Sequence, residues 1–250
     1  MRYDDRYWER SEHLDVYDES QDIFFKELED YLPVLYKYYP GRGLLLDVGC
    51  GTGEFLRLAQ KDGWQVSGVE PAPNIVEILR GKFAVPVYQG FFEKVEIASE
   101  SIDCLTMWDV IEHLYDPGSA LKKVSELLKP GGIFVFKTPN ERSLFKRLPL
   151  FLYKMTGGLF NSLLKFVYYD PHYYSYSVRC CRKMLARYGF EIEHIRLEST
   201  NMAFARKKLD LSYSRYPWTL RFVKLCLPLA ISLATLTGRQ NKIIVVARKI

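Results

Sequence analysis

The stretch that decides the fold is Leu44-Leu45-Leu46-Asp47-Val48-Gly49-Cys50-Gly51-Thr52-Gly53-Glu54. The mostly apolar run 44–48 predicts a buried strand, and the amphipathic residues 54–62 predict the helix that follows the glycines. A second apolar strand over 65–69 completes a β-α-β unit. Ligands of open α/β sheets bind beyond the carboxyl ends of the strands, at this kind of junction. The stretch therefore predicts a ligand site together with a fold class.

The acidic residues around the glycines indicate the charge of the ligand. Three closely spaced glycines let the backbone pass close under a bound molecule, where a Cβ would collide. A dinucleotide fingerprint would need its last glycine at position 54, where the helix N-terminus receives a pyrophosphate. Glu54 stands there, and Asp47 precedes the loop, so both favour a ligand with positive charge. Glu70 ends the next strand, where an acidic side chain accepts the hydroxyls of an adenosine ribose.

The alternation of strands and helices continues outward from this unit. Apolar runs predict strands at 85–88, 102–108, 133–136, 190–197 and 242–248, and amphipathic stretches predict helices at 74–82, 117–128 and 178–188. Apolar strands separated by helices are typical of a mostly parallel sheet that is covered on both faces. We therefore expect one α/β domain with seven strands and helices on both sides.

Composition excludes several other classes of protein. The chain has 250 residues, of which 48% are hydrophobic and 26% charged, so disorder and a disulfide-stapled scaffold are excluded. The five cysteines show no metal-binding spacing, and the Met1 end is charged rather than apolar. A reducing, cytoplasmic location is expected.

Charge is unevenly distributed along the chain. Residues 1–32 carry 4 basic and 11 acidic side chains, whereas residues 141–250 carry 20 basic and 6 acidic ones. A strongly basic region suits the phosphates of a nucleic acid or of an anionic membrane, or forms a solvated face that binds nothing.

Five motifs of the sequence together resemble those of a known protein family. The motifs are Leu44 to Gly53, Glu70-Pro71, Ile102 to His113, Leu127 to Gly132 and Thr138-Pro139-Asn140. In this order and spacing, over about residues 40–140, the chain resembles a class I S-adenosylmethionine-dependent methyltransferase. It is similar to the branch that includes the ubiquinone-biosynthesis O-methyltransferases. The resemblance implies a Rossmann-like sheet of strand order 3-2-1-4-5-7-6, with the last strand antiparallel.

The resemblance also implies which residues hold S-adenosylmethionine. The methionine part falls to Asp47 and the backbone of the glycine loop, the ribose to Glu70, and the sulfonium end to Asp109. Gly90 and Phe91 lie beside the adenine; most relatives have an acidic residue at position 91, so Glu93 or the backbone would bind the adenine amino group here. The full set of expected cofactor-binding residues is Asp47, Gly49, Cys50, Gly51, Gly53, Glu70, Pro71, Gly90, Phe91 and Asp109.

Hydroxyl acceptors need a base or a metal ion, and two histidines are candidates for catalysis. His113 follows the fourth strand and His172 lies in an aromatic stretch, and imidazole is the side chain best suited to proton transfer near neutral pH. Asp109, Glu112 and His113 also have the spacing of one helical face, where two carboxylates and an imidazole can bind a divalent cation. Some relatives hold magnesium with such a cluster and a later histidine, in a place like that of His172. Many relatives keep Glu-His without metal, so the metal ligands stay open.

The remaining segments are interpreted as attachments to a single domain that spans residues 1–250. Residues 1–40 are expected to form an N-terminal helical cap that contains Tyr3, Tyr7 and Trp8, and 41–140 the cofactor-binding core. Residues 141–176, rich in apolar, aromatic and basic side chains, form an acceptor-side lid. An apolar helical insert at 212–238 interrupts the C-terminal strands of 177–250. Only 225–237 lack charge there, which is too short to span a bilayer.

The sequence therefore predicts a methyltransferase that acts on oxygen of a small or lipid-linked acceptor, such as a quinone precursor or a sugar, with carbon and nitrogen as alternative acceptor atoms. Peripheral contact with the inner face of an anionic membrane is expected of its basic, apolar segments. Methylation of RNA ribose is one alternative, although nucleic-acid binding does not need so much Leu and Phe. A non-catalytic protein that keeps the fold, as a cofactor-binding or membrane-associated partner, is another.

Overall fold

The computed structural model describes residues 27–158, 172–203, 205–206 and 217–250. Its centre is a seven-stranded sheet of order β3-β2-β1-β4-β5-β7-β6, as the resemblance implied. The strands are β1 (Leu44–Val48), β2 (Gln65–Glu70), β3 (Val87–Gln89), β4 (Ile102–Trp108), β5 (Leu128–Pro139), β6 (Phe190–Glu198) and β7 (Lys242–Lys249). Strands β1 to β5 pair in parallel, and β7 runs antiparallel to both β5 and β6.

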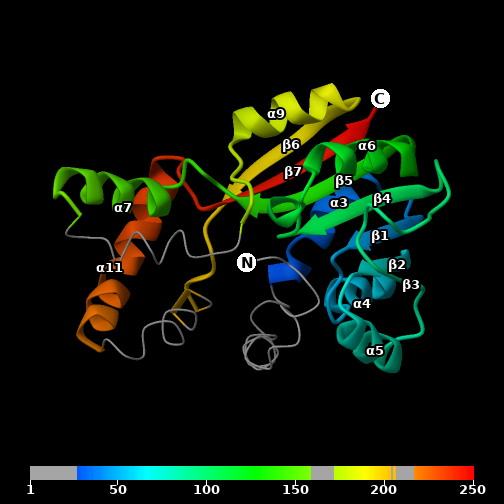
Figure 1. The fold of residues 1–250 in the computed structure, drawn as a ribbon, viewed down its shortest axis with the longest axis horizontal. Helices are drawn as coiled ribbons and strands as arrows, with labels where there is room; N and C mark the ends of the chain where they lie inside the picture. The colour runs from blue at the N-terminus through cyan, green and yellow to red at the C-terminus, as the bar shows by residue number, and fades with distance from the viewer. Residues whose placement is uncertain (1–26, 159–171, 204, 207–216) are drawn as a thin grey trace.

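Helices cover both faces of the sheet. They are α3 (Leu32–Tyr38), α4 (Glu54–Lys61), α5 (Pro73–Lys82), the 3-10 helix η1 (Ile111–His113), α6 (Pro117–Leu127), α7 (Leu144–Met155), α9 (Val178–Arg187) and α11 (Pro217–Leu236). Helices α6 and α9 pack on one face through a core that includes Leu105 and Phe134. Helices α3, α4 and α5 cover the other face over a core that includes Leu45 and Val135 (Figure 1).

Alternation along each strand explains why both faces carry a core. Every residue of β4 is buried, and neighbouring residues such as Cys104 and Leu105 contribute to opposite cores. This is the pattern expected of a central parallel strand. The predicted elements were confirmed with small shifts at their ends. The largest shift is at β5, which starts at Leu128 and is interrupted before Ile133 by a change of register against β4.

Two helices lie outside the sandwich. Helix α7 follows β5, α11 precedes β7, and the two pack against each other beyond the arrowheads of β4 and β5 (Figure 1). They fall within the lid and the apolar insert that the sequence predicts, while residues 159–171 and 212–216 of those segments lie outside the described residues. Of the N-terminal cap, the described part packs Leu28, Tyr31 and Leu35 onto the sheet, and Tyr3, Tyr7 and Trp8 lie outside it.

Candidate active site

A cavity of about 1040 Å³ opens at the carboxyl ends of β1, β2 and β4. This is the position where open α/β sheets bind ligands. Among the predicted residues, those that line it are Asp47, Gly49, Cys50, Gly51, Glu70, Pro71, Gly90, Phe91, Asp109 and His113. Gly53 and His172 are not part of this lining.

Two buried carboxylates at the glycine loop give the cavity its charge. Asp47 accepts a hydrogen bond from the Thr106 hydroxyl at 2.6 Å, because the two residues are paired across β1 and β4. Burial is the main reason that the pKa of Asp47 is raised to about 7; the hydrogen bond from Thr106 opposes the rise, and the charges of Glu70 and Glu54 add to it. A cation beside Asp47 would favour its ionised form.

Glu70 ties the glycine loop to the turn after β2. Its carboxylate accepts hydrogen bonds from the backbone N–H groups of Gly51 and Ala72, each at 3.0 Å. Burial raises the pKa of Glu70, while these two bonds oppose the rise. Each carboxylate oxygen keeps a second lone pair, so Glu70 can hold the loop and accept hydroxyl hydrogen bonds from a ligand at the same time.

Gly49 and Gly53 serve different purposes in the loop. Gly49 has φ of +70°, and a Cβ there would lie 2.6 Å from Cγ2 of Val110, which lines the cavity. Gly53 has φ of +85° at the start of α4, and a Cβ there would collide with Cδ1 of Leu79 in the core. Gly49 thus shapes the ligand cavity, whereas Gly53 permits packing of α4 against α5.

Aromatic and acidic side chains form the wall that the sequence assigns to adenine. Gly90 has φ of +137° and is followed by Phe91, Phe92 and Glu93, all of which line the cavity. Phe92 is buried and Phe91 is 42% exposed, so the two rings differ in how far they are available to a ligand.

On the other side, Trp108 forms a rigid wall. It lies between Tyr31, stacked at 4.7 Å between ring centroids, and Phe55, edge-on at 4.9 Å. Leu28, Phe55 and Trp108 all line the cavity. The N-terminal residues 27–31 are therefore a structural part of this site.

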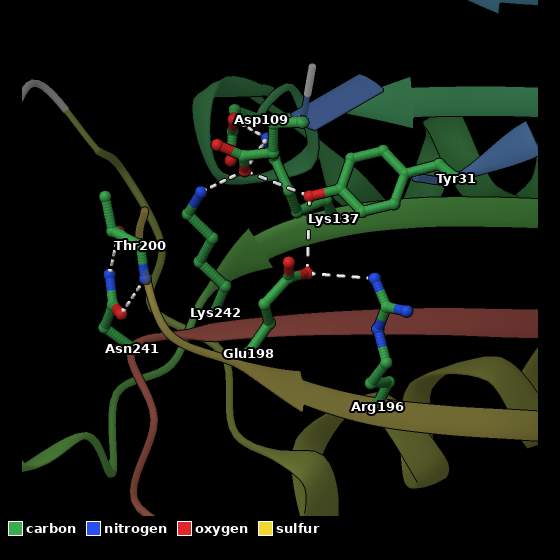
Figure 2. Close-up of polar contacts among 9 residues, drawn as sticks. Tyr31, Asp109, Lys137, Arg196, Glu198, Thr200, Asn241 and Lys242 are labelled. Atoms are coloured by element: carbon green, nitrogen blue, oxygen red, sulfur yellow. Dashed lines mark hydrogen bonds and ion pairs between the residues drawn. The ribbon is translucent and has the colours of Figure 1, made fainter. Parts of the chain in front are cut away.

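Asp109 projects from an unusual backbone conformation toward a buried lysine. Its φ is +55°, which a non-glycine residue adopts rarely, and its carboxylate lies 2.7 Å from Lys137 Nζ. Lys137 also pairs with Glu27 at 3.3 Å, and Glu27 in turn pairs with Lys242 and accepts a bond from the Tyr31 hydroxyl. Figure 2 shows the Tyr31 hydroxyl directed toward the Glu198 carboxylate, which also accepts a hydrogen bond from Arg196.

The charges in this network stabilise one another. Although burial opposes the effect, the ammonium groups of Lys137 and Lys242 lower the pKa of Glu27 to about 2. Burial likewise opposes ionisation of Lys137, yet Asp109 and Glu27 hold its pKa above the usual range. The ion pairs connect the N-terminal segment, β5 and β7 to the floor of the cavity beside Asp109.

A second cluster forms from Glu112, His113 and His172. One potential ligand atom of each residue lies within 4.8 Å of the others, and the centroids of the two imidazole rings are 4.6 Å apart. Glu112 accepts a bond from the Thr138 hydroxyl at 2.9 Å through Oε2. Its Oε1, 3.9 Å from His172 Nε2, has no hydrogen-bond partner among the described residues. Burial, with the charge of Asp109, raises the pKa of Glu112 well above its usual range.

The predicted grouping of Asp109 with Glu112 and His113 differs from this cluster. Asp109 turns toward Lys137, whereas His172 lies with the other two residues, in the place expected of the later histidine. The approach of His172 is supported by the backbone, because the N–H groups of Tyr173 and Tyr174 both donate to the carbonyl oxygen of Glu112.

Comparison with known proteins identifies the family to which the chain belongs. The profile described as a methyltransferase domain matches residues 20–195. The chain belongs to the class I S-adenosylmethionine-dependent methyltransferase family. S-adenosylmethionine is the methyl donor of this family. The matched residues contain every motif on which the resemblance rested.

Two curated relatives are O-methyltransferases with different names. Over 107 residues, this methyltransferase is 32% identical to a ubiquinone biosynthesis O-methyltransferase from Azorhizobium caulinodans, covering 40% of this chain and 42% of that protein. It is also 32% identical over 107 residues to a malonyl-[acyl-carrier protein] O-methyltransferase from Serratia marcescens, with 42% of each chain covered. The matched stretch thus spans less than half the length of these two relatives.

Solved structures support the fold. An S-adenosylmethionine-dependent methyltransferase from Archaeoglobus fulgidus superposes with a TM-score of 0.59 at 20% identity, covering 92% of this chain and 95% of that one. At this identity the likeness concerns the fold alone.

Several residues of the site were not predicted from the sequence, and three of them show why. Thr106, Trp108 and Lys137 contact the predicted residues or line the cavity. The sequence does contain a signal for Lys137. It is a charged residue at the end of an apolar run, and such a residue seldom enters a buried strand without a partner. Trp108 and Thr106 lie in a strand whose apolar pattern explains them without any ligand.

Proposed function

We propose that this protein transfers the methyl group of S-adenosylmethionine to an oxygen atom of a small or lipid-linked acceptor. The observation that carries the proposal is the pair of buried carboxylates, Asp47 and Glu70, beside the glycine loop in one cavity. A pyrophosphate would be repelled there, whereas a ligand with an ammonium group, a sulfonium and a free ribose matches these acids.

Each predicted residue has a role that its position supports. Asp47 would bind the ammonium group of the methionine part, and Glu70 the ribose hydroxyls. The backbone of Gly49, Cys50 and Gly51 would lie against the methionine part, while Pro71, Gly90 and Phe91 would border the nucleoside. Gly53 acts at a distance, by setting the start of α4.

Asp109 and His113 stand where the reaction would occur. S-adenosylmethionine supplies an electrophilic methyl group on a positively charged sulfur. Asp109, held by Lys137, places negative charge beside that end of the cavity. A ring nitrogen of His113 would accept the proton of the acceptor hydroxyl as its oxygen bonds to the methyl carbon, while the carbon–sulfur bond breaks and its electrons stay on sulfur.

Glu112, His113 and His172 also fit a divalent cation. A buried carboxylate oxygen without a hydrogen-bond partner, next to two imidazoles, is a suitable ligand set. The cation would lower the pKa of the acceptor hydroxyl and orient it. In that case both histidines are ligands rather than bases. Paramagnetic broadening of the histidine NMR signals by Mn²⁺ in wild type and in Glu112→Gln tests the site independently of activity, and equal broadening in both would reject it.

The oxygen acceptor is tested with methyl-labelled S-adenosylmethionine and a cell extract separated into lipid, small-molecule and RNA fractions. We expect wild type to label the lipid or the small-molecule fraction through an alkali-stable ether or a saponifiable ester bond. Label in RNA would favour ribose methylation instead. No label in any fraction, from protein that binds the donor, would favour a non-catalytic role.

A further inference from the structure

Helix α11 exposes a row of leucines that the catalytic site does not explain. The row, called the leucine stripe here, consists of Leu225, Leu229, Leu233 and Leu236, whose exposed fractions are 79%, 65%, 43% and 82%. At 3.6 residues per turn they fall within an arc of about 80°. Leu227 and Ala234, on the opposite side of the helix, are buried. The helix is thus anchored through one side and presents an apolar face on the other.

Helix α7 adds a second exposed apolar face next to α11. Leu148, Phe151 and Met155 follow i, i+3, i+7 spacing on α7, and all three are exposed. The two helices pack against each other outside the sheet sandwich (Figure 1). Several exposed apolar residues on one helix face mark an interaction site more often than isolated residues do.

The charges of the two helices indicate what kind of surface they would bind. Neither α7 nor α11 contains an acidic residue, and none occurs between position 211 and the end of the sequence at 250. Arg147 and Lys154 lie on α7, and Arg221 and Lys224 lie on α11. Leucines with basic side chains beside them complement a surface that is apolar within and anionic at its edge.

The length of α11 determines how it would meet a bilayer. Its uncharged part, Leu225–Leu236, has 12 residues, or about 18 Å of helix, against about 30 Å of hydrocarbon. Among the described helices, none combines the length and the apolarity that crossing a membrane requires. An orientation parallel to the surface, with the leucine stripe inserted below the headgroups, buries the apolar residues and leaves the basic ones at the phosphates.

We propose that α11, supported by α7, docks this protein on the surface of an anionic phospholipid bilayer. A second copy of the chain fits less well, because two basic helices without acids would be brought together. The docked face lies beyond the carboxyl ends of β4 and β5, at the end of the sheet that carries the cavity. The inference concerns binding alone and does not depend on the reaction.

The test measures cosedimentation of the full-length protein with vesicles of phosphatidylcholine, alone or with about one third phosphatidylglycerol. We expect binding to the anionic vesicles and much weaker binding to the neutral ones. The variants Leu225→Glu/Leu229→Glu and Arg221→Glu/Lys224→Glu should each weaken binding at least about tenfold. Ile78→Glu, a matched change of an exposed apolar residue on α5, should leave binding unchanged.

A second readout follows insertion directly. Cys226 is exposed on α11 beside Leu225, so a polarity-sensitive dye attached to it in a Cys180→Ser background should shift to shorter wavelength when anionic vesicles are added. Wild type that stays in the supernatant at low salt would overturn the proposal. Undiminished vesicle binding by the two double variants would also overturn it. The same holds for a dimer that depends on the leucines and does not bind vesicles, and for binding to RNA in place of vesicles.

Discussion

Lys137 Nζ lies 2.7 Å from the Asp109 carboxylate, and the two side chains differ sharply in burial. Lys137 is 1% exposed, whereas Asp109 is 40% exposed and lines the cavity. Lys137 is therefore held in place by its ion pair with Glu27 and by strand β5. It in turn positions the Asp109 carboxylate at the surface of the cavity. This arrangement links the stability of the N-terminal segment to the geometry of the proposed donor site.

Replacing Lys137 by Met should destabilise the fold by about 3–5 kcal/mol, because Glu27 loses a buried partner and Asp109 loses its orientation. Urea unfolding followed by circular dichroism measures the change. The matched control is Lys129→Met: Lys129 pairs with Asp103 at 2.8 Å but is 44% exposed, so about 0–1 kcal/mol is expected. Equal losses in the two variants would show that the buried network is no stronger than a surface pair.

Gly49→Ala should abolish donor binding, because its Cβ would collide with Val110 and its φ is positive. Gly131→Ala separates the two effects, since Gly131 has φ of +78° with open space around it. Its cost should be only the backbone strain, about 1–2 kcal/mol, with donor affinity unchanged. Calorimetric titration of both variants with S-adenosylmethionine measures the difference, and retained affinity in Gly49→Ala would contradict the role of this glycine.

Donor binding should release protons near neutral pH. Asp47 has a pKa raised to about 7, and a cationic ligand would pull that pKa down, so a proton leaves when the ligand binds below or near pH 7. Affinity should rise as the pH increases from 5.5 to about 7 and then level off. Titrations in buffers of different ionisation enthalpy measure the protons released. Affinity that is constant over this range would mean that the charge of Asp47 does not take part.

Glu112→Gln should stabilise the protein increasingly as the pH rises. The pKa of Glu112 is raised in the folded state, so wild type binds a proton there that the unfolded chain releases, and stability is lost as the pH rises above the unfolded value. Glutamine does not ionise and avoids this loss. Chemical unfolding at pH 6 and pH 9 should therefore give a larger advantage to the variant at pH 9. An advantage that is independent of pH would show that Glu112 ionises normally.

Much of the fold could be predicted because its signals are local. The apolar runs of β1 and β4 and the glycines after β1 each identify an element within a few residues. The order of the strands came from the resemblance, since pairing between distant strands leaves no trace in a single sequence.

The contacts of the site were less predictable, because they join residues far apart in the sequence. Glu27 meets Lys137 across 110 positions, and His172 meets Glu112 across 60 positions. Spacing alone placed Asp109 with Glu112 and His113, but a positive φ at Asp109 turns its side chain toward Lys137. The spacing of residues in a sequence does not predict a positive φ at a single position such as Asp109.

We expect the cavity to bind S-adenosylmethionine through Asp47 and Glu70. Calorimetric titration with S-adenosylmethionine and with S-adenosylhomocysteine, on wild type, Asp47→Ala, Glu70→Ala and the exposed control Glu77→Ala, tests it most directly. We expect micromolar binding by wild type and by Glu77→Ala, and loss of at least about tenfold in the other two variants. Binding that survives both changes, or folded wild type that binds neither ligand, would contradict the account.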